Sequence, residues 1–210
     1  MPQPNVINHP NLTVAPLTNV ALTMRALERS MDRSYLLPGL VALYGPAGYG
    51  KSTAATYATV KHRAYYVLVK SSWTRKALLL AILKEMGIEP AKTLYDLTDQ
   101  VAEQLTLSNR PLIIDEMDHL VDKNAVEIVR DIYEGSQGTI LLIGEENLPG
   151  KLKRWERFHG RVLEWVPAQP VSLDDAQHLA RIYCRELKIA DDVMARLLEL
   201  AHGSVRRVIV

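Results

Sequence analysis

The sequence has a single cysteine, no long apolar run and no excess of charge of either sign. The one cysteine, Cys184, excludes a disulfide framework within the chain and favours a reducing compartment. No apolar run approaches the roughly 20 residues that a membrane-spanning helix needs. The stretch from Met1 to Thr18 lacks the charged and then apolar order of a secretory signal. We therefore expect a cytoplasmic protein without a membrane partner.

The balance of charge limits what the surface can bind. Lysine and arginine number 25 and aspartate and glutamate number 24, so the net charge is +1. A nucleic-acid partner is neither required nor excluded, and any DNA-binding surface must be a local basic patch. A hydrophobic content of 48% over 210 residues is typical of a globular protein with one or two domains and a sizeable core.

The strongest motif is a glycine-rich loop that fits the pattern G-x-x-x-x-G-K-[ST]. It consists of Gly45-Pro46-Ala47-Gly48-Tyr49-Gly50-Lys51-Ser52, and Thr53 follows. The apolar run 40–44 before it suits a buried strand, and the Ala-rich run 52–60 after it suits a helix. Glycines let backbone N–H groups point at phosphate oxygens, and the helix N-terminus adds partial positive charge. We expect Lys51 to reach the β- and γ-phosphates and the Ser52 hydroxyl to ligate Mg²⁺.

The order of the remaining elements predicts an α/β fold. Further strands are expected at 64–70, 112–116, 139–144 and 161–166, and helices at 19–34, 73–86, 94–107, 124–133 and 152–159. Beyond them the pattern is helical throughout, at 173–187, 191–202 and 204–210. Strands that alternate with helices form a parallel sheet with right-handed crossovers. We therefore expect an N-terminal arm at 1–18, an α/β nucleotide-binding core at 19–168, and a small, incomplete helical domain at 169–210.

Two carboxylates end the strand expected at 112–116. Asp115 and Glu116 lie at the edge of the sheet where open α/β proteins bind their ligands. The Asp115 carboxylate suits the shell of Mg²⁺, either through water or through the Ser52 hydroxyl. Glu116 is expected to point to the other face and to polarise an attacking water. Together with the phosphate loop, the two carboxylates predict an ATPase that uses Mg²⁺.

These motifs, in this order, resemble the AAA+ ATPases, whose parallel core sheet has the strand order 5-1-4-3-2 and carries a helical lid. The resemblance covers roughly residues 18–210. It implies that a residue after the fourth strand is the polar sensor 1 of the nucleotide site, with Glu145, Glu146 and Asn147 as the candidates. It also implies that Arg206, in the segment Gly203-Ser204-Val205-Arg206, contacts the γ-phosphate from the lid as sensor 2.

The same resemblance implies a site completed by a second copy of the chain. Arg157, in Arg157-Phe158, is similar to the arginine finger that reaches the nucleotide of a neighbouring subunit, and Arg154 and Arg161 are rivals for that role. The implied assembly is a homo-oligomer, either a ring or a helical filament, with ATP and Mg²⁺ as cofactors.

Two stretches are similar to one group within this class. They are Asp115-Glu116-Met117-Asp118-His119-Leu120 and the strand 139–144 with its following acidic pair. The similar group comprises the transposition ATPases typified by the phage Mu B protein and the regulators of Tn7-like transposons. The similarity implies ATP-dependent filaments on double-stranded DNA without sequence preference, recruitment of a transposase, and work in the cytoplasm of a bacterium or a phage-infected host.

Contact with DNA requires cations that face the duplex. The first candidates surround the start of the helix expected at 73–86: Lys70, Ser72, Trp73, Thr74, Arg75 and Lys76. A helix N-terminus with hydroxyl donors and flanking cations suits phosphate oxygens, although Trp73 is more simply a core residue. Lys123 and Lys151 are second candidates, and a solvated surface is an equal alternative for them. Such contacts would be sensitive to salt and blind to sequence.

Two other functions fit the same nucleotide site. A helicase loader or replication initiator would share it but use a separate origin-binding or helicase-binding domain. A secretion or signalling ATPase would have a protein partner and no DNA. The sequence favours the transposition regulator, because its motifs are similar to that group in both content and spacing.

Overall fold

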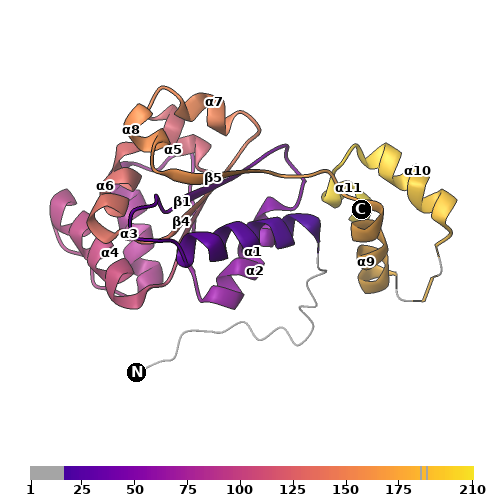
Figure 1. Cartoon of the computed structure of the whole chain (residues 1–210), viewed down its shortest axis with the longest axis horizontal. Helices are drawn as coiled ribbons and strands as arrows, with labels where there is room; N and C mark the ends of the chain where they lie inside the picture. The colour runs from indigo at the N-terminus through magenta and orange to yellow at the C-terminus, as the bar shows by residue number, and fades with distance from the viewer. Residues whose placement is uncertain (1–16, 185, 188) are drawn as a thin grey trace.

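The structure, a computed structural model, describes residues 17–184, 186–187 and 189–210. The arm predicted at 1–18 therefore lies outside the described residues, except for Leu17 and Thr18. A core of helices around a sheet continues through β5 into a cluster of three helices at the C-terminal end (Figure 1). No helix among the described residues is both long and apolar enough to cross a membrane.

Five strands form one parallel sheet. They are β1 (Leu40–Tyr44), β2 (Tyr65–Leu68), β3 (Leu112–Asp115), β4 (Ile140–Gly144) and β5 (Val162–Pro167). Their order across the sheet is β2-β3-β4-β1-β5, which confirms the predicted order 5-1-4-3-2. The register pairs Leu68 with Asp115 and Tyr44 with Gly144, so the carboxyl ends of the strands share one edge. Ligands of open α/β sheets bind at this edge.

Eleven helices are described in the ranges above. They are α1 (Thr18–Met31), α2 (Lys51–His62), α3 (Arg75–Met86), α4 (Leu94–Ser108), α5 (Asp118–Asp122), α6 (Glu127–Ser136), α7 (Leu148–Leu152), α8 (Glu156–His159), α9 (Leu173–Tyr183), α10 (Asp191–Ala201) and α11 (Val205–Ile209). The last three form the helical cluster at the end of the chain, which we call the lid (Figure 1).

The core is divided between the two faces of the sheet. Alternate residues of each strand point to opposite faces, so that Leu40 and Ala42 join one cluster while Val41 and Leu43 join the other. Helices α3, α4 and α6 cover the first face, and α1 and α2 cover the second. The strands are apolar on both sides because parallel sheets are covered on both sides.

The prediction of one basic helix at 152–159 is wrong. The chain forms two short helices there, α7 and α8, which are separated at 153–155. Trp155 has φ −107° and ψ 67°, outside the helical region, and it immediately precedes α8. The helix predicted at 124–133 also begins later, at Glu127, because Asn124 has the left-handed φ of 53°. The short helix α5 was not predicted.

Candidate active site

The phosphate loop joins the end of β1 to the start of α2. Gly48 and Gly50 have φ values of 84° and 82°, a left-handed conformation that costs glycine little. The helix starts at Lys51, directly after Gly50, so its first free N–H groups and its positive end face the loop. This is the anion-binding geometry that the sequence motif predicts.

The Lys51 side chain turns back into the loop. Its ammonium donates hydrogen bonds to the carbonyl oxygens of Gly45, at 2.6 Å, and Pro46, at 2.8 Å. Burial lowers the pKa of Lys51, while the negative charges of Glu116 and Asp115 act in the opposite direction. The cation therefore lies at the site where the motif places phosphates, among carboxylates that help to keep it charged.

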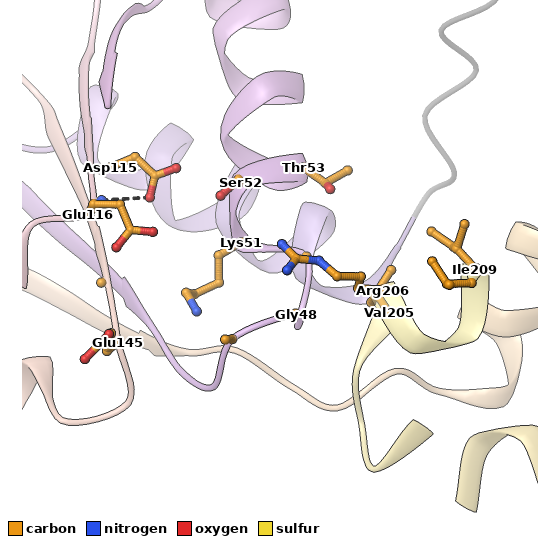
Figure 2. Close-up of a pocket in the computed structure, with 14 residues that line it drawn as sticks. Gly48, Lys51, Ser52, Thr53, Asp115, Glu116, Glu145, Val205, Arg206 and Ile209 are labelled. Atoms are coloured by element: carbon orange, nitrogen blue, oxygen red, sulfur yellow. Dashed lines mark hydrogen bonds between the residues drawn. The ribbon is translucent and has the colours of Figure 1, made fainter. Parts of the chain in front are cut away.

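A cavity of about 330 Å³ opens beside the loop. Loop, strand ends and lid all contribute to its wall, as Figure 2 shows. Its lining consists of Ala47, Gly48, Gly50, Lys51, Ser52, Thr53, Asp115, Glu116, Gly144, Glu145, Val205, Arg206, Ile209 and Val210. The structure thus brings together residues from four separate parts of the sequence in a single pocket.

Asp115 is fixed by two hydrogen bonds at the end of β3. It is 2% exposed, and its carboxylate accepts from the Tyr66 hydroxyl and from the backbone N–H of Glu116, each at 2.9 Å. Burial first, and then the charge of Asp115, raise the pKa of Tyr66 well above its usual value, so the phenol stays protonated as a donor. This partner could not be predicted from the sequence pattern, because Tyr66 and Asp115 are 49 positions apart.

Glu116 has a different environment from its neighbour. It is exposed, lines the pocket and adopts a φ of 57°, an uncommon conformation for a residue other than glycine. Backbone strain of this kind is concentrated at functional sites. In Figure 2 the Glu116 carboxylate points into the space in front of Lys51.

After β4, the pocket is lined by Glu145 and not by the other two candidates. Glu146 and Asn147 lie outside the lining. The backbone N–H of Glu145 donates to the Asp118 carboxylate at 2.6 Å, and Asp118 is itself 3% exposed. The contact fixes the turn after β4 against α5.

Arg206 reaches the pocket from the lid. Its backbone N–H donates to the Gly48 carbonyl at 3.3 Å, so the start of α11 lies directly on the phosphate loop. Its exposed side chain extends from α11 toward Lys51 and Ser52 (Figure 2). This position agrees with the sensor 2 role that the resemblance implies, and the contact with the γ-phosphate remains a prediction.

The three candidate finger arginines lie on or beside α8, outside the pocket of their own chain. Arg154 donates to the Val121 carbonyl at 3.0 Å, and Arg161 forms an ion pair with Glu134 at 2.6 Å. Arg157 is exposed, and its guanidinium has no hydrogen bond or ion pair with any described residue. Of the three, Arg157 is thus the one available to another molecule.

Most of the predicted DNA contacts lie together. Lys70, Ser72, Thr74, Arg75 and Lys76 are exposed around the start of α3, where Thr74 caps the helix by accepting from the N–H of Ala77. Trp73 is partly buried against the core, as its alternative interpretation predicts.

Of the second candidates, only Lys123 lies near α3. Lys123 donates to the Trp73 carbonyl at 3.1 Å, and Arg75 donates to the Asn124 carbonyl at 3.0 Å. Lys151 instead forms ion pairs with Asp118, at 3.0 Å, and Asp122, at 3.2 Å. Two carboxylates of its own chain therefore already balance the charge of Lys151.

The side chains around the loop suit Mg²⁺ bound together with phosphates. Mg²⁺ prefers a few hard oxygen donors and keeps several waters. The Ser52 hydroxyl and the Asp115 carboxylate border the same pocket and are donors of this kind. The described residues contain no cluster of three or more metal-binding side chains, so the phosphates and water would supply the remaining ligands.

A parallel sheet in the order 5-1-4-3-2, with a phosphate loop after β1 and two acidic residues at the end of β3, defines a P-loop ATPase of the AAA+ class. The profile of the AAA domain family matches residues 36–152, which is more than half of the chain. The chain therefore belongs to this family.

Comparisons with single proteins give more distant likenesses. Replication factor C subunit 1 of Saccharomyces cerevisiae is 29% identical over 173 residues, covering 80% of this chain and 20% of that protein. The ORC1 protein of Aeropyrum pernix, in complex with DNA, has a TM-score of 0.63 and 18% identity over 92% of this chain and 58% of that one. The replication initiator DnaA, bound to AMPPCP and single-stranded DNA, has a TM-score of 0.57 and 16% identity, over 89% and 58% of the two chains.

The chain thus spans about a fifth of the curated relative and less than two thirds of each solved chain. At these identities the two solved structures show the AAA+ fold alone.

Proposed function

We propose that this protein is a DNA-binding ATPase whose copies assemble with ATP held between neighbours. The exposed Arg157 supports the proposal most directly. It lies outside the pocket of its own chain and has no partner among the described residues, unlike Arg154 and Arg161. An arginine that approaches the phosphates of a neighbouring copy would stabilise the charge that develops during phosphoryl transfer.

Each residue of the pocket then has a defined role. Lys51 and the loop N–H groups bind the phosphates, and Ser52 with Asp115 holds Mg²⁺, which neutralises charge on the β- and γ-phosphates. Glu116 orients and polarises the attacking water. Arg206 contacts the γ-phosphate and thereby links the position of the lid to the bound nucleotide. We further propose that residues 19–168 act as the nucleotide-binding core and residues 169–210 as the lid.

For DNA, we propose the surface formed by Lys70, Ser72, Thr74, Arg75 and Lys76, with Lys123 beside it. Its exposed cations and hydroxyls at the start of α3 suit the phosphate backbone of a duplex. Binding through the backbone is independent of sequence and weakens steeply as salt rises. The similar ORC1 and DnaA structures are both complexes with DNA, which supports a nucleic-acid partner for this protein.

Within this class, we propose selection of transposition targets and activation of a transposase. The support is the sequence pattern from Asp115 to Leu120 and around the strand 139–144. A second candidate is a replication initiator or loader, favoured by the likeness to replication factor C subunit 1, ORC1 and DnaA.

Imaging by negative-stain electron microscopy tests the proposal. The protein is mixed with a slowly hydrolysed ATP analogue and a duplex of arbitrary sequence. Filaments that require both components support the target selector, whereas rings that form without DNA contradict it. Assembly confined to particular sequences would support the initiator instead. Lys51→Ala should abolish assembly. Assembly that survives this change would contradict the proposal that bound nucleotide controls assembly.

A further inference from the structure

One buried side-chain amide connects the phosphate loop to the segment 168–172 between β5 and α9, which we call the lid hinge. Asn19, in the first turn of α1, is 5% exposed. Its Nδ2 group donates to the Tyr49 carbonyl at 2.8 Å and to the Gln169 carbonyl at 2.7 Å. Its Oδ1 atom accepts from the backbone N–H of Gln169 at 2.8 Å. Asn19 thereby joins the loop, which is 30 positions away in sequence, to the segment between β5 and α9, which is 150 positions away.

Tyr49, the loop residue that Asn19 holds, is also in contact with the lid. Its hydroxyl lies 3.5 Å from the His202 carbonyl. Gly203 has a φ of 80°, and a Cβ atom there would lie 2.5 Å from the Tyr49 hydroxyl. The Gly48 carbonyl accepts from the backbone N–H of Arg206 at 3.3 Å. Tyr49 is therefore held at its backbone by the core and at its side chain by the lid.

A second connection runs in parallel. The Thr18 backbone N–H donates to Asp175 at 2.7 Å, and the Thr18 hydroxyl donates to the same oxygen at 3.1 Å. Asp175 is 4% exposed, and its other oxygen accepts from the N–H of Ser172 at 3.0 Å. The start of α1 is thus tied to the start of α9 next to the point where Asn19 holds the hinge.

We infer that Asn19 is a positioning residue for ATP hydrolysis. Its side chain holds the phosphate loop and the lid hinge in a fixed position relative to each other. With the Tyr49 carbonyl turned toward Asn19, the neighbouring N–H groups of the loop are free to face phosphates. With Gln169 fixed, the lid carries Arg206 to the same pocket. An amide suits this position because it donates two hydrogen bonds and accepts another from one side chain. Its loss leaves buried carbonyls without a donor.

This inference rests on the proposed nucleotide site, and steady-state hydrolysis of MgATP by the full chain tests it. Asn19→Ala should raise KM for ATP by about tenfold, the effect of a lost buried hydrogen bond, with a smaller change in kcat. The matched control is Ser30→Ala on the same helix. Ser30 is buried and donates to the Gly39 carbonyl at 2.9 Å, at the opposite edge of the sheet. It should lower the melting temperature and leave KM unchanged.

Equal KM values for Asn19→Ala and Ser30→Ala would overturn the inference. If Asn19→Ala does not fold, Asn19→Asp replaces it, since this change keeps the size and the acceptor for the Gln169 N–H but removes the donor to the Tyr49 and Gln169 carbonyls. An Asn19→Asp protein with the KM of the wild type would also overturn the inference. Wild-type protein that does not bind ATP, or Lys51→Ala that binds it normally, would instead contradict the proposed nucleotide site.

Discussion

At the scale of single residues, two adjacent carboxylates of the site lie in different environments. Asp115 is buried and accepts two hydrogen bonds, so its orientation is fixed. Glu116 is exposed at the pocket in a strained backbone conformation. A fixed carboxylate suits a metal ligand, and a free one beside the phosphates suits activation of water.

Replacing Glu116 by Gln should separate binding from hydrolysis. The amide cannot polarise water as a carboxylate does, so kcat should fall by about 100-fold or more, the usual contribution of general-base catalysis. Affinity for ATP should be unchanged, because Lys51 and the loop remain intact. Isothermal calorimetry and a phosphate-release assay measure the two quantities. A variant that hydrolyses ATP at the wild-type rate would rule out this role for Glu116.

Replacing Tyr66 by Phe should disturb Asp115 without touching nucleotide. Loss of the donor leaves a buried carboxylate oxygen unpaired, which costs about 1.5–3 kcal/mol for a bond to a charged group. We expect lower stability and a lower rate of hydrolysis, measured by chemical denaturation and at saturating MgATP. Tyr65→Phe is the control, since its hydroxyl accepts from Gln104 at 3.0 Å in the cluster on the other face of the sheet. Equal hydrolysis rates in the two variants would show that Tyr66 does not position Asp115.

At the scale of elements, the pocket depends on the turn between α10 and α11. Gly203 in this turn has φ 80°, and Gly87 at the end of α3 has φ 74°. A Cβ at Gly203 would meet Tyr49 and the Pro170 Cβ, the latter at 2.8 Å, whereas a Cβ at Gly87 would meet nothing within 4 Å. The two glycines thus share a left-handed backbone conformation but differ in contact with the site.

Changing each glycine to Ala distinguishes strain from contact. Both variants should lose about 1–2 kcal/mol of stability from the left-handed conformation. Gly203→Ala should in addition raise KM for ATP several-fold, since the lid must move away from Tyr49, while Gly87→Ala should not. Thermal melts and hydrolysis assays provide both values. A normal KM in Gly203→Ala would show that the lid contact has no effect on the site.

An element could be predicted from the sequence where residues next to one another in the chain determine its conformation, and not where contacts between distant residues determine it. Strand β1 was predicted with its correct bounds because its apolar residues lie next to a glycine-rich loop. The break between α7 and α8 could not be predicted, since Trp155 at the break packs against a core formed by residues distant in sequence. The partners of Tyr66 and Asn19 could not be predicted either, because the pairing of β2 with β3 brings Tyr66 to Asp115 and the placement of α1 brings Asn19 to Tyr49 and Gln169. Among the sensor 1 candidates, only the fold could show that Glu145 lines the pocket.

At the scale of the whole molecule, we propose that the site of one copy is completed by a second copy of the chain. Lys51, Asp115, Glu116 and Arg206 border the pocket, but the free Arg157 lies outside it. A second copy can supply this arginine, so that ATP would hold neighbours together and hydrolysis would release them. Assembly on DNA would then follow the state of the nucleotide.

Mixing two inactive variants tests this shared site most directly. Glu116→Gln retains Arg157 but cannot hydrolyse, and Arg157→Ala retains Glu116 but should lose about a thousandfold in kcat without the arginine. In an equal mixture, about a quarter of the interfaces between copies combine an intact Glu116 with an intact Arg157. We predict that the mixture hydrolyses ATP far faster than the sum of the two variants. A mixture no faster than that sum, or Arg157→Ala with the wild-type rate, would contradict a site shared between copies.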